Sequence, residues 1–588
     1  MHRRNFFYSA LSSAFFAGTL FDSSGPTSSR SASSSPRQRA DLQADVVVYG
    51  GTSGGVMAAY TAKRHGRSVV LVTPGRNLGG LTTGGLGMTD FGSTDAIHGL
   101  AREFYRRVGA HYDQEEAWRF SPSVAERVME AYLDEAGVEV LSSRRVVAVE
   151  KDGSEIEAIT CEYAGPGESA PPIRVSGRYF IDTSYEGDLL ARAGVSYTVG
   201  RESNQTYGEQ YNGVQFEGNQ GAPGASNHQF PGYESRETLS ERRGGGGAGS
   251  TTTPVDPYVR PGDPSSGLLP EITKEGVAPN GTGDRKVQAY NFRMCCTQNE
   301  ANKIPFPRPE GYDPARYELL RRDMEADPPE SLDDLFKIDR MPEEKSDWNN
   351  RGAFSTDFIG QNWDYPEASY RRREQIWAAH RRYQQGLCYF VANDDRVPDH
   401  IQEEMNTWGL ARDEFLDTDH WPHALYVREG RRMVGDFVMT EQNVIGDQKV
   451  GDGVAEGAYT MDSHHVQRVV VEGPDGPMVK NEGNVQVGVP EPYPISYRAL
   501  VPRQSEATNL VVPVALSSSH IAFGSIRMEP VFMMLGQAGG LAAAMAHERH
   551  ANVQALEGRE LQEELKARPL TGRSVPAEAQ DVVPYSFE

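Results

Sequence analysis

The sequence predicts an α/β chain in which a parallel sheet, built from two distant stretches, is interrupted by an inserted α+β domain. Three observations lead to this prediction. A strand, glycine turn, helix and strand follow one another from Ala44, a second strand ends near Asp182, and another buried strand begins at Leu510. Because 588 residues are too many for one ordinary domain, we expect two domains or one domain with insertions.

The first element is a βαβ unit over residues 44–75. The β-branched run from Asp45 to Tyr49 is typical of a strand buried on both faces of a parallel sheet. A helix over 56–64 and a second strand over 68–72 follow. A unit of this kind holds a dinucleotide's pyrophosphate on backbone N–H groups at the helix N-terminus. The candidate residues are Gly50, Gly51, Thr52, Ser53, Gly54 and Gly55.

Two positions depart from the usual dinucleotide fingerprint. Thr52 stands where the middle glycine normally lets the backbone approach the phosphates, and its hydroxyl is a candidate donor to a phosphate oxygen. Thr73 stands where an acidic residue usually meets the ribose, and we expect it to make a weaker hydrogen bond there. From this unit alone, a Rossmann-like domain without a ligand remains an alternative.

A glycine-rich loop, GRNLGGLTTGGLGMTDFG, follows the second strand. Such a loop lets the backbone wrap closely around a ligand. With this loop, the sequence resembles the FAD-dependent oxidoreductases of the two-dinucleotide-fold group. It is most similar to a bacterial family of exported or cytoplasmic members, some of them labelled xanthan lyase. The candidate contacts in this stretch are Arg76, Gly79, Gly80, Leu81 and Thr82.

The resemblance implies FAD as the cofactor and a Rossmann-like FAD-binding domain. Members of that family typically carry threonine at the place of Thr52, which makes this residue a family variant. They usually carry glutamate at the place of Thr73, so the ribose contact is where this chain departs from the family.

The stretch YFIDTSYEGDLLARAGVSYTVGRE, residues 179–202, is similar to the second flavin-binding motif of that family. We expect a strand ending at Asp182, a turn, and a helix starting near residue 187. In relatives this strand end meets the pyrophosphate and adenosine side of FAD. The strand over 144–153 looks like the one whose backbone contacts adenine, although an ordinary hairpin strand explains it equally well. The candidate residues are Val147, Asp182, Thr183, Gly187 and Asp188.

The closing segment continues the resemblance. A buried strand over 510–516 leads into a serine-rich loop that presents His520, Arg527 and Glu529. Pro530 suits the first position of a helix over 531–547, which is crowded with small residues and includes Gly536. In relatives this helix start faces the pyrimidine edge of the isoalloxazine, where its dipole stabilises negative charge on the reduced ring. We therefore expect the FAD-binding domain to comprise residues 44–200 and 495–560.

Residues 201–494 are predicted to form the inserted substrate or cap domain, with a glycine-rich insertion over 218–270. Helices are expected over 312–327 and 370–385. The stretch 345–366 is dense in amides, carboxylates and aromatic residues, a composition that suits sugar binding, although a plain loop-rich domain explains it nearly as well.

Four residues are candidates for catalysis. If residues 459–468 form a strand, His464 and His465 point to opposite faces, so only one reaches a given site and the other is structural. A metal pair is not expected for the same reason. His520 is a candidate substrate contact or proton acceptor, and Arg527 a candidate for binding an anionic or hydroxyl group. An ordinary hydrogen-bonded loop histidine is the alternative for His520.

The ends of the chain are expected to lie outside the fold. Residues 1–22 have a basic start with Arg3–Arg4 and an apolar stretch, the layout of an export signal of the twin-arginine kind. A disordered cytoplasmic tail is the alternative. Residues 23–43 are predicted to form a flexible linker and 561–588 a tail. With this signal, the protein is expected in the periplasm or outside the cell.

Composition excludes several classes of function. The net charge of −23 disfavours a nucleic-acid partner, because phosphate binding relies on a basic face. No apolar run in the sequence is long enough for a transmembrane helix. The four cysteines lack the spacing of an iron–sulfur site and are expected in the core. No metal site is predicted.

These observations favour an FAD-dependent oxidoreductase that transfers a hydride between flavin and a polar, carbohydrate-derived substrate. A small molecule or an oligosaccharide fits that description, and the electron acceptor stays unidentified. Two alternatives remain: a lyase-like carbohydrate-active enzyme with a structural flavin, and a flavin-free binding protein on the same fold.

Overall fold

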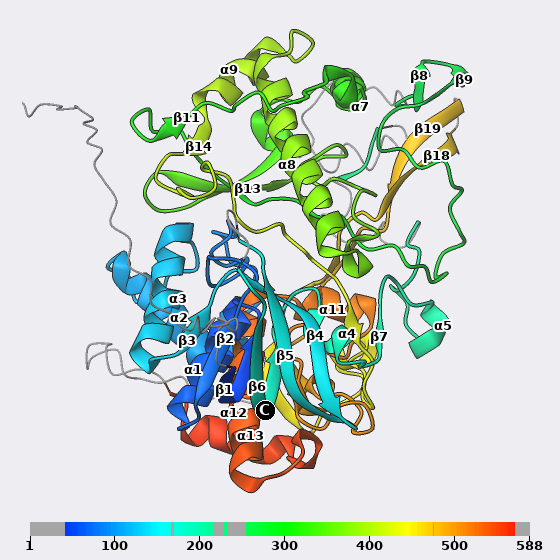
Figure 1. The fold of residues 1–588 in the computed structure, drawn as a ribbon. Coiled ribbons are helices and arrows are strands. Elements are labelled where there is room, and N and C mark those ends of the chain that lie inside the picture. Colours follow the sequence, from blue (N-terminus) through cyan, green and yellow to red (C-terminus); the bar gives the residue numbers. More distant parts are fainter. Residues whose placement is uncertain (1–40, 166–169, 217–227, 232–253, 474–475, 571–588) are drawn as a thin grey trace, which may run out of the picture. The chain divides into compact units, whose positions relative to one another are not determined.

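The computed structural model describes residues 41–570, apart from 166–169, 217–227, 232–253 and 474–475 (Figure 1). The predicted export signal, almost all of the predicted linker, most of the glycine-rich insertion and the end of the predicted tail lie outside the described residues. From Asp41 onward the chain forms one compact unit.

A seven-stranded sheet organises the first and last parts of this unit (Figure 1). Strands β3, β2, β1, β6 and β22 run parallel, and β5 and β4 continue the sheet antiparallel. The last strand, β22, pairs with the carboxyl end of β6, so the closing segment joins the sheet begun by the opening one. The strands are β1 (Leu42–Tyr49), β2 (Val69–Val72), β3 (Glu139–Leu141), β4 (Arg144–Asp152), β5 (Glu155–Tyr163), β6 (Ile173–Asp182) and β22 (Leu510–Val511).

Side chains of β1 alternate between the two cores of this sheet. Val46 and Val48 pack on one face, and Val47 and Tyr49 on the other. A parallel strand covered on both faces needs apolar residues in succession, which explains the run that the sequence shows. The helices around this sheet are α1 (Ser53–Arg64), α2 (Gly99–His111), α3 (Pro122–Ala136), α4 (Asp188–Arg192), α11 (His520–Ile526), α12 (Glu529–Arg549) and α13 (Gly558–Ala567). The predicted α/β fold, a Rossmann-like domain made from two separate stretches, is confirmed.

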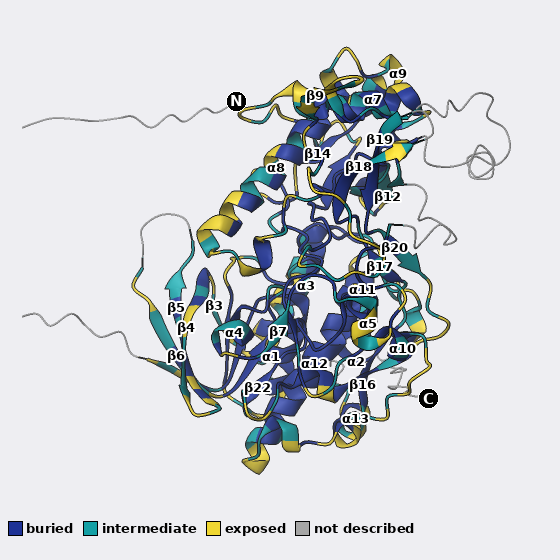
Figure 2. Cartoon of the chain, turned by 90° about the vertical axis from the view of Figure 1, so that its right-hand side faces the viewer, coloured by how far each residue is buried: buried dark blue, intermediate teal, exposed yellow. Residues whose placement is uncertain are grey.

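Helices α1 and α12 are in closer contact than ordinary side chains allow, and both are almost entirely buried (Figure 2). A Cβ placed on Gly536 would lie 2.0 Å from the carbonyl oxygen of Gly54, and one on Gly540 would lie 2.3 Å from that of Ala58. The glycines of α12 therefore bring its backbone against α1, whose N-terminus is the predicted pyrophosphate site.

The inserted region has its own antiparallel sheet and its own apolar core. The order is β11 (Lys303–Ile304), β14 (Gly409–Ala411), β10 (Met294–Thr297), β13 (Lys345–Asn350) and β12 (Phe336–Arg340). Its helices are α5 (Asn204–Tyr207), α7 (Glu318–Ala326), α8 (Tyr370–Asn393), α9 (Asp399–Thr407) and α10 (Glu441–Val444). Five two-stranded ladders are described besides the two sheets: β7 (Tyr197–Thr198) with β15 (Arg432–Met433), β8 (Tyr258–Arg260) with β9 (Asp263–Leu268), β16 (Gly453–Gly457) with β21 (Tyr493–Ser496), β17 (Met461–Ser463) with β20 (Val485–Val487), and β18 (Gln467–Gly473) with β19 (Gly476–Glu482). Of these, β16–β21 and β17–β20 pack in the first core, against α12 and α11.

Several local expectations differ from the structure. The helix predicted over 370–385 continues to Asn393, and the one predicted over 312–327 begins with a 3₁₀ turn before α7. The predicted tail begins inside α13, which packs Leu561 and Leu565 into the core. The described end of the predicted glycine-rich insertion forms the hairpin β8–β9, and Val255 and Leu269 on either side of the hairpin are buried in the second core.

Two expectations from composition can be compared with the described residues. Cys161, Cys295, Cys296 and Cys388 are all free and buried, so their expected place in the core is confirmed. Within the described part of the chain, no helix combines the length and apolar character that crossing a bilayer requires. The bounds of the predicted domains stay predictions.

Candidate active site

The turn between β1 and α1 is held by the second predicted flavin motif. Gly50 has a φ of +110°, and a Cβ there would lie 2.7 Å from the backbone of Thr183. Thr52 caps α1 by accepting from the N–H of Gly55 at 3.2 Å, and its hydroxyl donates to the Thr183 carbonyl at 2.9 Å. The Thr52 hydroxyl thus forms hydrogen bonds within the protein, whereas the sequence predicted that it donates to a phosphate oxygen of the cofactor.

Three strand ends meet beside this turn. Tyr49 of β1 is paired with Val72 of β2 on one side and with Asp182 of β6 on the other. Ligands of open parallel sheets bind outside the carboxyl ends of such strands. Thr73, directly after β2, lies against Gly51, where a Cβ would be 2.6 Å from its hydroxyl oxygen. The structure therefore brings Gly51 and Thr73 together at the expected edge.

Asp182 and Asp188 order the second motif. Asp182 accepts hydrogen bonds from the N–H and hydroxyl of Ser184 and from the N–H of Leu190. Burial raises the pKa of Asp182 to about 6. Asp188 follows Gly187, whose φ is +63°, and forms ion pairs with Arg373 of α8 at 2.8 Å and with Arg431 at 3.0 Å. Both carboxylates have protein partners, and their predicted contact with FAD stays a prediction.

The glycine-rich loop packs against the same turn. The N–H of Gly79 donates to the carbonyl of Gly51 at 2.8 Å. A Cβ on Gly80 would lie 2.2 Å from the hydroxyl oxygen of Tyr185, whose hydroxyl accepts from the N–H of Leu81. The predicted residues of the turn, the loop and the second motif are therefore neighbours in space.

A buried carboxylate joins the three segments. Glu529, the first residue of α12, accepts hydrogen bonds from the hydroxyls of Ser53 at 2.6 Å, Thr82 at 2.7 Å and Tyr185 at 2.7 Å. Burial raises its pKa despite these donors. Neither Glu529 nor Tyr185 was among the predicted site residues.

Three predicted cofactor residues have other surroundings. Arg76 is exposed, and Val147 is 38% exposed at a bulge of β4. Gly536 lies against the backbone of Gly54, a position that a packing role explains. Gly536 is thus beside Gly54 of the predicted cofactor turn, and the FAD contacts predicted for all three residues stay predictions.

A cavity of about 320 Å³ lies next to the glycine-rich loop. Asp90, from the end of that loop, lines it, and so does Tyr426, which packs against Leu81 and Leu86. The lining residues are Asp90, His228, Arg293, Lys337, Asn349, Asn350, Arg351, Tyr426, Tyr459, Thr460, Asp462, His464 and Gln486. Among the described residues this lining contains no aliphatic side chain, so it suits a ligand rich in hydrogen-bonding groups.

His464 and Arg527, two of the four predicted catalytic residues, meet at Asp462. Nε2 of His464 lies 3.4 Å from Oδ2 of Asp462, and the Arg527 guanidinium lies 2.5 Å from the same oxygen. Burial alone would raise the pKa of Asp462, but His464 and Arg527 lower it to about 2. Arg527 also donates to the hydroxyl of Tyr426 at 3.3 Å. The carboxylate at this wall is therefore ionised and fixed between two partners.

Asp357 holds the other side of the His464 ring. Its Oδ2 lies 2.7 Å from Nδ1 of His464, and its Oδ1 lies 3.0 Å from Arg428. Asp357 is buried, and although burial alone would raise its pKa, Arg428 and His464 hold it well below the usual range. An ionised acid on Nδ1 orients the ring and leaves Nε2 for the cavity side.

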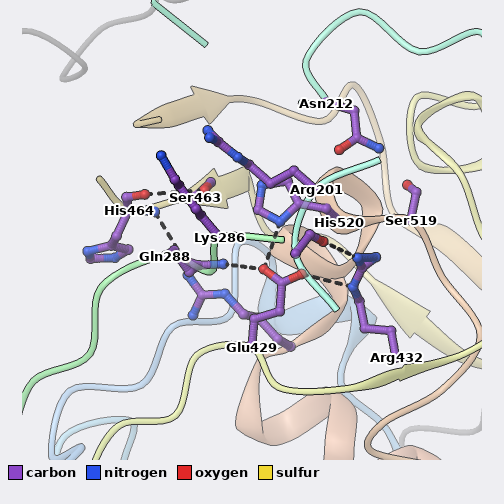
Figure 3. Close-up of polar contacts among 12 residues, drawn as sticks. Arg201, Asn212, Lys286, Gln288, Glu429, Arg432, Ser463, His464, Ser519 and His520 are labelled. Carbon is purple, nitrogen blue, oxygen red and sulfur yellow. Dashed lines mark hydrogen bonds and ion pairs between the residues drawn. The ribbon is translucent and has the colours of Figure 1, made fainter. Parts of the chain in front are cut away.

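His520 belongs to a separate buried network (Figure 3). Its Nδ1 lies 2.7 Å from Glu429, which also pairs with Arg432 at 2.8 Å. Gln288 donates to Glu429 at 3.0 Å and accepts from the backbone N–H of His464 at 3.0 Å (Figure 3). Figure 3 thus shows His520 and His464 linked through two intermediate residues, and His520 is not part of the cavity lining.

The two adjacent histidines do have different surroundings, but the premise of one continuous strand was wrong. They lie between β17 and β18, where the chain leaves one ladder for another. Nε2 of His465 lies 3.0 Å from the carbonyl oxygen of His228, and burial lowers the pKa of His465 to about 3. The neutral His465 does not line the cavity, whereas His464 does.

Sequence reasoning missed most partners in this site. Asp462 stands two residues before His464, and that spacing was an available signal. Asp357 carried only the polar composition of the stretch 345–366 as a signal, and Arg293 and Tyr426 carried none, because their roles arise from contacts across the sequence. They are brought to the site by the inserted sheet and by the chain that returns from it.

The residues at the strand ends fit a dinucleotide. Glycines at positions 50, 51 and 80 let the turn and the loop pack closely beside the first turn of α1. Backbone N–H groups and a positive dipole end at a helix N-terminus are what a pyrophosphate requires.

Solved structures resemble this chain over about a quarter to a third of its length. Thermovibrio ammonificans THI4 has 16% identity, covers 27% of this chain and 67% of its own, and has a TM-score of 0.21. AlpK has 19% identity, covers 32% and 40%, and has a TM-score of 0.20. The 3-ketosteroid-Δ4-(5α)-dehydrogenase from Rhodococcus jostii RHA1 has 15% identity, covers 26% and 48%, and has a TM-score of 0.19. Similarities this low support no functional argument.

No curated protein sequence matches the chain significantly. A family model described as FAD dependent oxidoreductase, however, matches residues 45–565. This match spans both stretches of the parallel sheet and the inserted region between them. The chain therefore belongs to the FAD-dependent oxidoreductase family, and FAD is its cofactor.

Proposed function

We propose that this protein transfers a hydride between FAD and a polar, hydroxyl-bearing organic substrate that binds in the cavity lined by His464. The observation that supports this most directly is the convergence of His464, Asp462 and Arg527 at one wall of that cavity. Tyr426 connects the same wall with Leu81 of the glycine-rich loop, next to the residues that fit the cofactor.

His464 is proposed to act as the proton acceptor. Asp357 fixes Nδ1, and a substrate hydroxyl would reach Nε2 by replacing its 3.4 Å contact with Asp462. In oxidation of a secondary alcohol, the carbon loses a hydride, the oxygen loses its proton to His464, and a ketone results. Bound FAD supplies the two-electron acceptor for that hydride.

Arg527 and Asp462 are proposed to orient the substrate. Asp462 is ionised and accepts hydrogen bonds, and the planar Arg527 guanidinium keeps that carboxylate and the Tyr426 hydroxyl in fixed positions. On another part of the lining, Tyr459 donates to Asp90 at 3.2 Å. These groups offer several fixed donors and acceptors, as a polyhydroxylated substrate requires.

The composition of the stretch 345–366 supports a carbohydrate-derived substrate only in part. Asn349, Asn350 and Arg351 line the cavity and supply polar groups for sugar hydroxyls. Trp348, one of the aromatic residues of that stretch, is fully buried in the core of the inserted domain and cannot stack on a sugar ring. Within the cavity lining, Tyr426 and Tyr459 are the aromatic side chains proposed to stack on a sugar ring.

An anaerobic screen tests the reaction. Purified holoprotein is mixed with sugars, sugar acids, polyols, amino acids and amines, and bleaching of the visible flavin band identifies substrates. With a substrate in hand, we expect His464→Gln to slow flavin reduction by about 10²- to 10⁴-fold, the usual contribution of a positioned base.

The matched control is His465→Gln, which changes the neighbouring histidine on the other side of the chain. It is expected to lower stability while leaving the reduction rate nearly unchanged. Equal rates for wild type and His464→Gln would contradict the proposed role, and bleaching by none of the compounds would contradict the proposed function.

Export through a twin-arginine route is also proposed, on the basis of Arg3–Arg4 and the following apolar stretch. Cell fractionation of the full chain beside an Arg3→Lys, Arg4→Lys variant tests it. Equal amounts of both proteins in the exported fraction would contradict this route.

A further inference from the structure

Glu529 is an unusual carboxyl group for its surroundings. It is buried, and it forms no ion pair with any lysine, arginine or histidine in the described part of the chain. A buried carboxylate is costly unless hydrogen bonds or a cation compensate it. Here the compensation comes from hydroxyl donors and from the N-terminal turns of α1 and α12, where negative charge is favoured.

The donors to Glu529 come from three distant segments. Ser53 is the first residue of α1, Thr82 lies in the glycine-rich loop, and Tyr185 follows β6. Up to 476 positions separate donor and acceptor along the sequence. These are the three segments whose residues fit the dinucleotide, so a single carboxylate fixes their positions relative to one another.

The neighbouring charged and titratable groups do not take over this role. Tyr185 donates to one carboxyl oxygen and accepts from the N–H of Leu81. Burial raises the pKa of the Tyr105 hydroxyl on α2, and the nearby Glu529 carboxylate raises that pKa further. Arg527 lies two residues earlier, but its guanidinium contacts Asp462 and Tyr426. The three hydroxyls therefore depend on Glu529 for their common acceptor.

We propose that Glu529 is a cofactor-positioning residue that ties Ser53, Thr82 and Tyr185 into one surface against which FAD binds. The carboxylate accepts all three hydrogen bonds, whereas an amide in its place presents an NH₂ group toward hydroxyls that need an acceptor. Loss of the carboxylate consequently loosens the cradle that binds FAD. This inference rests on FAD as the cofactor and is independent of the proposed substrate.

The test measures FAD affinity directly. Apoprotein of wild type and of Glu529→Gln is titrated with FAD, and quenching of flavin fluorescence gives the dissociation constants. Hydrogen bonds to a charged acceptor are strong, so we expect a dissociation constant about 10- to 100-fold higher in Glu529→Gln. Thermal melting of the apoprotein, followed by circular dichroism, is recorded in parallel.

Glu414→Gln is the matched control. Glu414 is also buried, and it accepts from the N–H and hydroxyl of Ser123 and from Lys345, outside the three cofactor segments. We expect this variant to melt at a lower temperature with a dissociation constant within about threefold of wild type. Equal loss of affinity in both variants, or no loss in Glu529→Gln, would overturn the proposal.

A double-mutant cycle distinguishes positioning from general destabilisation, and its single-donor variants remain available if Glu529→Gln folds poorly. Ser53→Ala and Thr82→Val each remove one donor and are expected to weaken FAD binding about 3- to 10-fold. If Thr82 acts through Glu529, Thr82→Val adds little to the effect of Glu529→Gln. Unchanged affinity in both single-donor variants, or strictly additive effects in the cycle, would overturn the proposal.

Discussion

The contact between α1 and α12 makes Gly536→Ala a sharp test of the fold. A Cβ at position 536 would lie 2.0 Å from the carbonyl oxygen of Gly54. Ordinary van der Waals contact begins at about 3.4 Å, so the two helices would have to separate by more than an ångström. The obstacle is backbone, which cannot rotate away as a flexible side chain does.

The expected cost follows from two opposing terms. Overpacking of a buried site costs typically about 1–3 kcal/mol, and a backbone obstacle places this site at or beyond the upper end. Alanine gains about 1 kcal/mol over glycine in helix propensity. The net effect is a destabilisation of about 2 kcal/mol or more, which lowers the melting temperature by a few degrees.

Gly539→Ala on the same helix is the control. Its Cβ would lie 3.4 Å from Val511 and 3.6 Å from Pro513, which is ordinary contact. This variant is expected to be neutral or slightly stabilised by the propensity term. Thermal melting of both variants as apoprotein, with FAD titration of each, is the measurement.

Two outcomes would refute this reasoning. Equal melting temperatures for the Gly536→Ala and Gly539→Ala variants would show that α1 and α12 are not in the close contact described. Weakened FAD binding in Gly536→Ala without loss of stability would show instead that Gly536 acts at the cofactor, as the sequence suggested.

Three further predictions concern the cavity and its surroundings. Asp357→Asn is expected to slow flavin reduction by about 10²-fold or more, because His464 loses the acceptor that fixes its ring; an unchanged rate would argue against that role. Arg527→Lys is expected to raise KM about tenfold, because one ammonium cannot hold both Asp462 and the Tyr426 hydroxyl, and an unchanged KM in steady-state assays would contradict this. The contribution of His228 to the unfolding free energy should fall as the pH is lowered from about 6.5 to about 4, because burial lowers the pKa of His228 to about 4. In that window the unfolded histidine binds a proton that the folded one does not, and identical profiles of unfolding free energy against pH for wild type and His228→Gln would contradict this.

The sequence by itself determined the parallel sheet and its cofactor edge. Consecutive β-branched residues in β1 require cover on both faces, and the glycine turn at Gly50 places a helix start after that strand. The closing strand was also predicted as a buried run over 510–516, although only Leu510–Val511 forms β22, and its pairing with β6 came from the structure. These features depend on short-range periodicity, which any stretch of sequence carries within itself.

Only the tertiary structure decided which side chains act together. His464 meets Asp357 and Arg527, and Glu529 meets Ser53, through packing of elements that are far apart in the chain. The same packing places the Thr52 hydroxyl where it donates to the Thr183 carbonyl. It also gives His465 a different partner, the His228 carbonyl, from those of the adjacent His464. Local patterns fix the strand or helix on which a residue lies, but its partners depend on how the two cores bring distant elements into contact.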